Sequence, residues 1–124
     1  MSKRVIIFDD DPDILNICSI ILTARGYQVA TNTSCDNLLE AITEFEPNVI
    51  VMDNKIPAIG GVEATRLIKG NAATAHIPVV FFSANTHVAE LTREAGADIY
   101  IQKPFDISTF EQVLGQMIAR ANVE

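Results

Sequence analysis

The stretch V-I-V-M-D-N-K-I-P, residues 49–57, places four apolar residues directly before a carboxylate. An uninterrupted apolar run of this kind is typical of a strand that is buried on both faces, as in parallel sheets. A carboxylate at the edge of a core is costly unless a partner offsets its charge. Asp53 therefore either lies in a solvated loop or is held at the strand end for chemistry.

Outward from that stretch, strand patterns alternate with helical patterns along the chain. Five strands are predicted, at residues 4–8, 27–31, 49–52, 77–82 and 99–102. Four helices are predicted between them, at residues 12–25, 38–45, 62–69 and 86–95, and a fifth carries Phe110 to Ile118. Strict alternation with buried strands predicts an α/β fold, a doubly wound parallel sheet of five strands with helices on both faces.

Two helix starts are predicted from their capping residues. Asp11 precedes Pro12, and this pair suits the N-cap and first turn of the first helix. Ser108 and Glu111 have the spacing of a capping box for the last helix.

The composition limits the class of protein. The chain has 124 residues, of which 48% are hydrophobic, which predicts one globular domain over residues 1–124. Its net charge of −7 argues against nucleic acid and anionic membranes as direct partners. No signal peptide or membrane-length apolar run is found, so we expect a cytoplasmic protein. Cys18 and Cys35 fit no metal-binding spacing and are interpreted as reduced apolar residues.

Polar residues follow several of the predicted strands. Asp9 and Asp10 follow the first strand, Asp53 the third, Ser83 the fourth and Lys103 the fifth. Ligands bind at the carboxyl ends of the strands in open α/β sheets, so these side chains are expected to converge. Clustered carboxylates repel one another unless a cation joins them, and oxygen ligands suit Mg²⁺. Asp53 would then be an ionised nucleophile for a phosphoryl group, and Ser83 could hydrogen-bond a phosphoryl oxygen.

The motifs resemble those of the receiver domain of two-component response regulators, in particular a single-domain, chemotaxis-type receiver. The matching motifs are the acidic pair Asp9-Asp10, the D-x-x-x-P-x-x-x-G pattern from Asp53 to Gly61, the pair Ser83-Ala84 and the K-P-F sequence from Lys103 to Phe105. The resemblance extends from about residue 4 to residue 119. It implies a flavodoxin-like (βα)5 fold with strand order 2-1-3-4-5.

The resemblance also implies roles for the residues at the strand ends. Asp53 looks like the phospho-acceptor, and Lys103 would pair with the phosphate. Mg²⁺, with Mn²⁺ as a substitute, would bind Asp10, Asp53 and the backbone carbonyl of Lys55. Asp9 would help directly or through a water molecule.

A conformational switch is implied as well. Ser83 would move toward the phosphoryl group, Tyr100 would turn inward, and the peptide bond between Lys103 and Pro104 would be cis. The surface of the fourth helix, fifth strand and fifth helix would then change its partner preference. The same surface could form a weak dimer of an otherwise monomeric protein.

The resemblance implies a signalling role for the chain. The phosphoryl donor would be a sensor histidine kinase or a histidine phosphotransfer protein, and the output would be a downstream protein target or onward transfer in a phosphorelay. The chain would catalyse only its own phosphorylation and dephosphorylation, so it is not interpreted as a turnover enzyme.

Two other readings are weighed against this one. The chain could be a receiver-like interaction module that is never phosphorylated, although Asp10, Asp53 and Lys103 are all present. It could also be a phosphatase of the haloacid dehalogenase type, because F-D-D-D-P at residues 8–12 resembles the opening motif of that class, with Asp9 as the nucleophile. That reading leaves the pattern from Asp53 to Gly61 unexplained.

Overall fold

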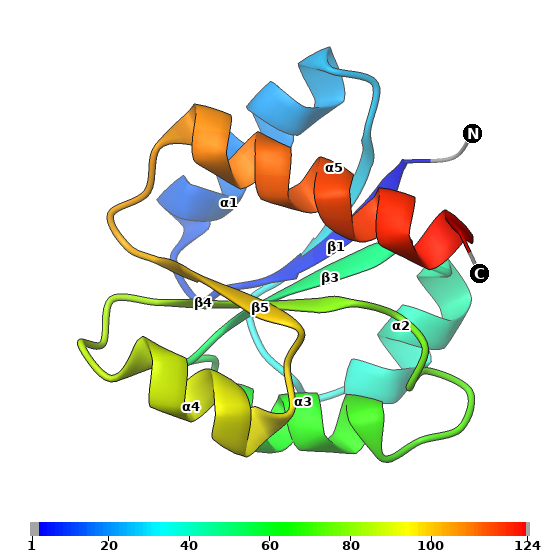
Figure 1. Ribbon diagram of the computed structural model, residues 1–124, viewed down its shortest axis with the longest axis vertical. Helices are drawn as coiled ribbons and strands as arrows, with labels where there is room; N and C mark the ends of the chain where they lie inside the picture. The colour runs from blue at the N-terminus through cyan, green and yellow to red at the C-terminus, as the bar shows by residue number, and fades with distance from the viewer. Residues whose placement is uncertain (1–2, 124) are drawn as a thin grey trace.

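The computed structural model describes residues 3–123, and the side chains of residues 3–120, as one parallel sheet flanked by helices (Figure 1). The elements are β1 (Arg4–Phe8), α1 (Pro12–Ala24), β2 (Gln28–Asn32), α2 (Leu38–Phe45), β3 (Val49–Asp53), α3 (Gly61–Lys69), β4 (Val79–Ser83), α4 (Val88–Ala95), β5 (Ile99–Gln102) and α5 (Ile107–Val123). The strand order is β2-β1-β3-β4-β5 and all pairs are parallel, which confirms the predicted fold class. Among the described helices, none is long and apolar enough to cross a membrane.

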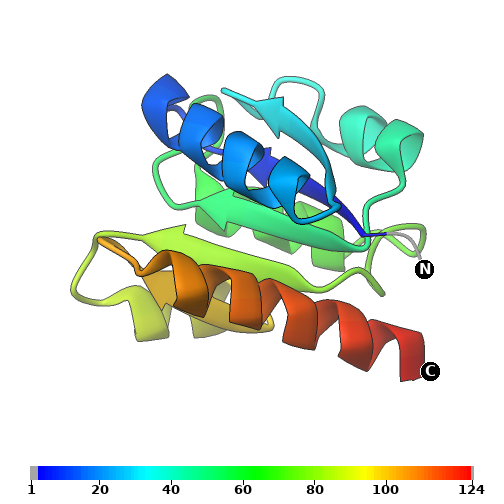
Figure 2. The same ribbon diagram turned by 90° about the horizontal axis from the view of Figure 1, so that it is seen from above.

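The helices form two layers, one on each face of the sheet. Helices α1 and α5 cover one face, and α2, α3 and α4 cover the other (Figures 1 and 2). Every residue of β3 and β4 is buried, as the apolar runs predict. Alternate residues of β3 serve the two layers: Val49 and Val51 pack with α1 and α5, whereas Ile50 and Met52 pack with α2 and α3. Helices therefore pack against the central strand from both faces of the sheet.

The two cysteines are free and buried, in agreement with their interpretation as apolar residues. Cys18 packs in the α1 and α5 layer and Cys35 in the α2 and α3 layer. Burial, with smaller contributions from nearby aspartates, raises the pKa of each thiol to about 11. Both sulfurs are therefore protonated at neutral pH.

Some predicted boundaries are wrong. The fourth strand begins at Val79 and not at residue 77, because Pro78 has no N–H to donate to the ladder and offers only its carbonyl, to Ile50. The predicted second strand is shifted by one residue, to Gln28–Asn32. At α1 the prediction is confirmed, because the Asp11 side chain accepts a hydrogen bond from the N–H of Asp13.

The predicted capping box of the last helix is wrong. Helix α5 begins at Ile107, so Ser108 lies inside it. The carbonyl of Asp106 accepts the N–H of Phe110 at 3.0 Å and begins the helical pattern. The Glu111 carboxylate pairs with Arg25, at the end of α1. Glu111 thus links two helices of one layer and does not cap its own.

Thr65 in α3 offers a test of the core. Its side chain is fully buried, and its hydroxyl has no hydrogen-bond partner in the described part of the chain. Because a buried hydroxyl without a partner is costly, we expect Thr65→Val to raise the free energy of unfolding by about 1 kcal/mol. Chemical denaturation measures the change.

A second buried threonine provides the matched control. The Thr74 hydroxyl donates to the carbonyl of Ile68 at 2.7 Å, so Thr74→Val removes a real bond and is expected to lower stability. A loss of stability in Thr65→Val as large as that in Thr74→Val would contradict the assignment.

Candidate functional site

The carboxyl edge of the sheet brings together side chains from three different strands. Asp9 follows β1, Asp53 is the last residue of β3 and Lys103 follows β5. The ammonium of Lys103 lies 2.8 Å from Asp9 Oδ2 and 2.8 Å from Asp53 Oδ1. Asp9 is fully buried and Asp53 is 4% exposed. One lysine thus bridges two buried carboxylates that are distant in sequence.

The second oxygen of each carboxylate is also bound. Asp9 Oδ1 accepts the backbone N–H of Asp11 at 2.9 Å. Asp53 Oδ2 accepts the backbone N–H of Lys55 at 3.0 Å. Each carboxylate is therefore oriented by its own loop as well as by Lys103. Each oxygen also keeps a lone pair that can meet a further cation or ligand.

Burial and charge change the acidity of this pair. Burial raises the pKa of Asp53 above its ordinary value, and the negative Asp9 adds to the effect, although hydrogen bonds from Lys103 and Lys55 oppose it. Burial by itself lowers the pKa of Lys103. The hydrogen bonds and charges of Asp53 and Asp9 outweigh that effect, so the pKa of Lys103 lies above its ordinary value. Lys103 is thus held as an ammonium ion.

A third carboxylate joins the edge. Ligand oxygens of Asp9, Asp10 and Asp53 all lie within 4.8 Å of one another, and Asp10 is exposed. The ammonium of Lys103 bonds to two of these three carboxylates, so the cluster keeps an excess of negative charge. Hard oxygen donors with this excess fit a divalent cation such as Mg²⁺, open to solvent on the side of Asp10.

The other predicted residues lie around this cluster. Ser83 ends β4 and is 2% exposed, and its hydroxyl oxygen accepts the N–H of Asn85 at 3.0 Å. The peptide bond between Lys103 and Pro104 is cis. Lys55 is exposed beside Asp53. Tyr100 is 43% exposed on β5 and is not part of the cluster.

For two residues at the site, the sequence does not predict the contacts that the structure shows. Gly61 begins α3, and a Cβ atom there would lie 2.4 Å from the carbonyl oxygen of Asp53. The D-x-x-x-P-x-x-x-G pattern contains this glycine but does not say what it contacts. The ring of Phe82, in β4, lies under the ammonium of Lys103, with 4.5 Å from Nζ to the ring centroid. No sequence signal distinguishes it from the other apolar residues of β4.

An apolar groove of about 410 Å³ adjoins Lys103. It lies between α1 and the segment that leads from β5 to α5. Its lining is Ile14, Ile17, Cys18, Ala84, Lys103, Pro104, Phe105 and Ile107. Ile17 is 52% exposed, so the rim beside the site presents apolar surface to solvent.

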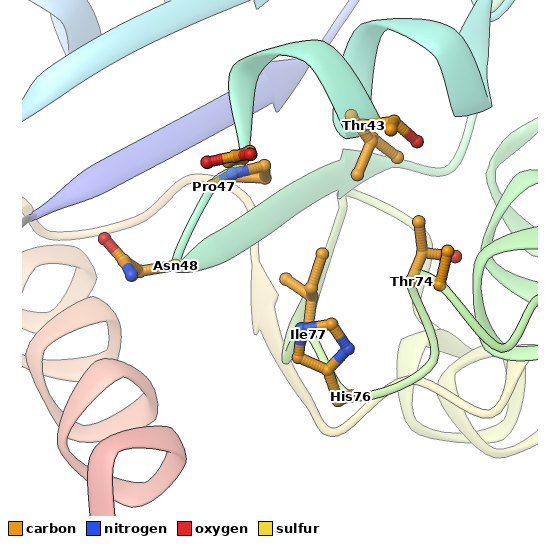
Figure 3. A pocket seen from close by; sticks show the side chains of 9 residues that line it. Thr43, Pro47, Asn48, Thr74, His76 and Ile77 are labelled. Carbon is orange, nitrogen blue, oxygen red and sulfur yellow. The ribbon is translucent and has the colours of Figure 1, made fainter.

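A second pocket lies at the opposite edge of the sheet, where β3 and β4 begin. It has a volume of about 420 Å³, and Figure 3 shows its lining. The lining residues are Ile42, Thr43, Glu46, Pro47, Asn48, Ala73, Thr74, His76 and Ile77. His76 is exposed, as expected of a surface histidine. None of the predicted site residues lines this pocket, so it is separate from the acidic cluster.

Comparison with known families gives a match over most of the chain. The family model of the response regulator receiver domain matches residues 5–115. A Mycobacterium tuberculosis protein named transcriptional regulatory protein KdpE is 35% identical over 108 residues, which are 86% of this chain and 46% of that protein. The chain thus spans about half the length of the curated relatives it matches.

Solved structures share the fold. A response regulator receiver domain protein from Methanospirillum hungatei superposes with a TM-score of 0.88 at 23% identity, covering 98% of both chains. The receiver domain of a sensor histidine kinase from Pseudomonas aeruginosa, solved with a magnesium ion in its active-site cleft, gives a TM-score of 0.87 at 22% identity. That match covers 96% of this chain and 99% of the other.

Proposed function

Because this chain belongs to the response regulator receiver domain family, we propose that it accepts a phosphoryl group on Asp53 in a magnesium-dependent reaction. The donor is a phosphohistidine of a sensor histidine kinase or of a histidine phosphotransfer protein. The observation that carries the proposal is the Lys103 ammonium 2.8 Å from oxygens of both Asp9 and Asp53. A buried carboxylate that accepts a hydrogen bond from a lysine ammonium at the open edge of a sheet is suited to nucleophilic attack.

The transfer exchanges one bond for another at phosphorus. A carboxylate oxygen of Asp53 forms the new P–O bond while the P–N bond to the donor histidine breaks, and the bonding pair leaves with the imidazole nitrogen. Lys103 offsets the negative charge of the phosphoryl oxygens as they approach. The Ser83 hydroxyl, at the end of the neighbouring strand, is proposed to donate a hydrogen bond to one of these oxygens.

The acidic cluster is proposed to hold Mg²⁺, with Mn²⁺ as a substitute. Asp10, Asp53 and the backbone carbonyl of Lys55 are the proposed protein ligands, and Asp9 contributes directly or through a water molecule. The metal, when bound, supplies positive charge that polarises the phosphoryl group. The excess negative charge of three carboxylates beside one ammonium supports this assignment.

The output is proposed to be a change of protein contact on the face of α4, β5 and α5. The backbone N–H of Lys103 donates to the carbonyl of Ser83 at 2.8 Å, which links the two strand ends directly. Tyr100 is 43% exposed on β5, and it is proposed to turn inward when Ser83 moves toward a phosphoryl group. Phosphorylation would favour one of two existing arrangements. The partner of that face is a downstream protein, or a second copy in a weak dimer.

The groove beside Lys103 is proposed as part of the contact with the phosphoryl donor. Lys103 both lines this groove and bonds to Asp53, so a protein that presents a phosphohistidine to Asp53 would lie next to the groove. The groove is mostly apolar, and apolar surface next to a charged centre is typical of a protein contact.

The first experiment is to incubate the protein with Mg²⁺ and a small-molecule phosphodonor, measure the intact mass and map the modified residue. A phosphate on Asp53 that requires Mg²⁺ is the expected result. A phosphate on Asp9 would favour a phosphatase of the haloacid dehalogenase type. The absence of any adduct, under conditions that label a control receiver, would favour an interaction module that is not phosphorylated.

Lys103→Ala tests the role of the bridging ammonium. We expect residual labelling of Asp53 at a rate lower by about 100-fold, because one charged group that stabilises the transferring phosphoryl is lost. We also expect Tyr100 to keep its outward position after labelling, as judged by its NMR signals. Lys69→Ala is the control, because Lys69 pairs with Asp98 away from the cluster. An unchanged labelling rate in Lys103→Ala would contradict this role.

A further inference from the structure

The ammonium of Lys103 has a third partner besides the two carboxylates. Its Nζ atom lies over the ring of Phe82, 4.5 Å from the ring centroid, and 2.8 Å from an oxygen of each of Asp9 and Asp53. A cation over the face of an aromatic ring is attracted by the negative charge of that face. The Lys103 side chain is only 17% exposed, which strengthens the attraction because little water competes.

The ring itself is held from several sides. Phe82 is fully buried in β4, between β3 and β5. Its ring contacts Phe105 with centroids 4.9 Å apart and Phe110 with centroids 5.8 Å apart, and these two rings lie 5.1 Å from each other. Phe105 is two residues beyond Lys103, so the segment that carries the ammonium also packs on the ring beneath it. The three rings form one aromatic cluster, and its Phe82 ring lies beneath the Lys103 ammonium.

On the premise of the function proposed above, we propose that Phe82 is a positioning residue for Lys103 in phosphoryl transfer. The ring occupies one side of the ammonium and attracts it. The Lys103 Nζ atom is thereby kept within hydrogen-bonding distance of Asp9 and Asp53 before the phosphoryl group arrives. Without such a contact, a long lysine side chain would lose considerable rotamer freedom when it is fixed in one position during the reaction. The ring restricts that freedom in advance and thereby favours the transition state.

Two other buried residues of β4 provide comparisons for Phe82. Val80, also fully buried in β4, belongs to the same core cluster but is aliphatic. Phe81, the neighbour of Phe82, is fully buried in the opposite layer with Val88 and Ala95. It therefore provides a phenylalanine on the same strand whose ring lies in a different core.

Ring fluorination separates the charge of the ring from its shape. Phenylalanine analogues with one, two and three ring fluorines are placed at Phe82 by site-specific incorporation, and the same series is placed at Phe81. The rate constant for phosphorylation of Asp53 is measured with Mg²⁺ and a small-molecule phosphodonor. We expect it to fall stepwise at Phe82, by about 2- to 30-fold over the series, the range that a lost cation–π attraction produces. At Phe81 we expect no trend.

A second readout does not depend on phosphorylation. The ring face should shift the NMR signals of the Lys103 methylene next to Nζ upfield in the unphosphorylated protein. Phe82→Leu keeps an apolar side chain in the core but removes the ring, so the upfield shift should disappear in that variant. The fluorinated proteins keep the shape of the ring, so they provide the test if Phe82→Leu does not fold.

The outcomes separate this inference from the proposed function. A wild-type protein that is never labelled on Asp53 would overturn the function, and with it the role of Phe82 in transfer. Normal labelling with the same rate throughout the Phe82 series, or with equal trends at Phe82 and Phe81, would overturn the inference alone. Lys103 methylene signals without an upfield shift would also overturn it.

Discussion

Replacing Asp53 by asparagine is expected to abolish phosphorylation while raising the stability of the metal-free protein. The amide cannot form the acyl phosphate, so the mass change that maps to Asp53 should disappear completely. Stability should rise because the environment of Asp53 disfavours its charged form: burial raises its pKa, and the charge of Asp9 raises it further. Removal of a charge that the folded state disfavours is therefore expected to raise the free energy of unfolding at neutral pH.

The pH dependence of this gain follows from the direction of the pKa shift. A carboxyl whose pKa is higher in the folded state binds its proton more tightly when folded. Its contribution to stability is present at low pH and is lost as the pH rises through the folded-state pKa. In acid, Asp53 is protonated and resembles asparagine. We therefore expect the stability gain of Asp53→Asn to be largest near neutral pH and to vanish in acid, as measured by denaturation at several pH values.

Magnesium should reverse the order of stability. A cation that binds only the folded protein stabilises it by about 2.7 kcal/mol at 100 times its dissociation constant. Asp53→Asn removes one proposed ligand, so the variant should gain much less from the metal. Glu44→Gln, which neutralises an exposed acid on α2, is the matched control and should respond to Mg²⁺ as the wild type does. Full labelling of another aspartate in Asp53→Asn would refute the assignment of the acceptor.

The sequence predicts the convergence of Asp9, Asp53 and Lys103 because parallel strands share one direction. Residues that follow such strands meet at one edge, even when 94 positions separate Asp9 from Lys103. The apolar runs predict buried central strands for the same reason, and β3 and β4 are buried throughout. These features depend on periodicity and on the order of the elements, both of which can be predicted from the sequence.

The contacts inside the site could not be predicted in the same way. That Lys103 bridges Asp9 and Asp53 depends on strand register and on the rotamer of a long side chain, which apolar periodicity does not encode. The apolar run of β4 predicts that Phe82 is buried, but it does not predict that a cation lies over its ring. The capping box at Ser108 fails because α5 already begins at Ile107, where the backbone carbonyl of Asp106 accepts the N–H of Phe110.

Gly61→Ala is expected to be the most destabilising of the substitutions considered. A Cβ atom at Gly61 would lie 2.4 Å from the carbonyl oxygen of Asp53, 2.8 Å from Cα of Asn54 and 2.9 Å from the carbonyl carbon of Asp53. All three atoms belong to the backbone, so no side chain can rotate away. Helix α3 would have to move from the end of β3. We expect the free energy of unfolding to fall by about 3 kcal/mol, the upper part of the usual cost of overpacking.

The same substitution should also impair the site, because the displaced backbone carries Asp53. A shift of about 1 Å in a reacting group can cost about 100-fold in rate, so labelling of the folded fraction should fall by that order. Gly115→Ala, in α5, is the matched control. A Cβ atom there meets nothing within 4 Å, and replacing a glycine inside a helix should raise stability by about 1 kcal/mol without changing labelling. Equal stability of Gly61→Ala and the wild type would show that the junction of β3 and α3 can move at little cost. In that case the close approach of Gly61 would not hold Asp53 in place.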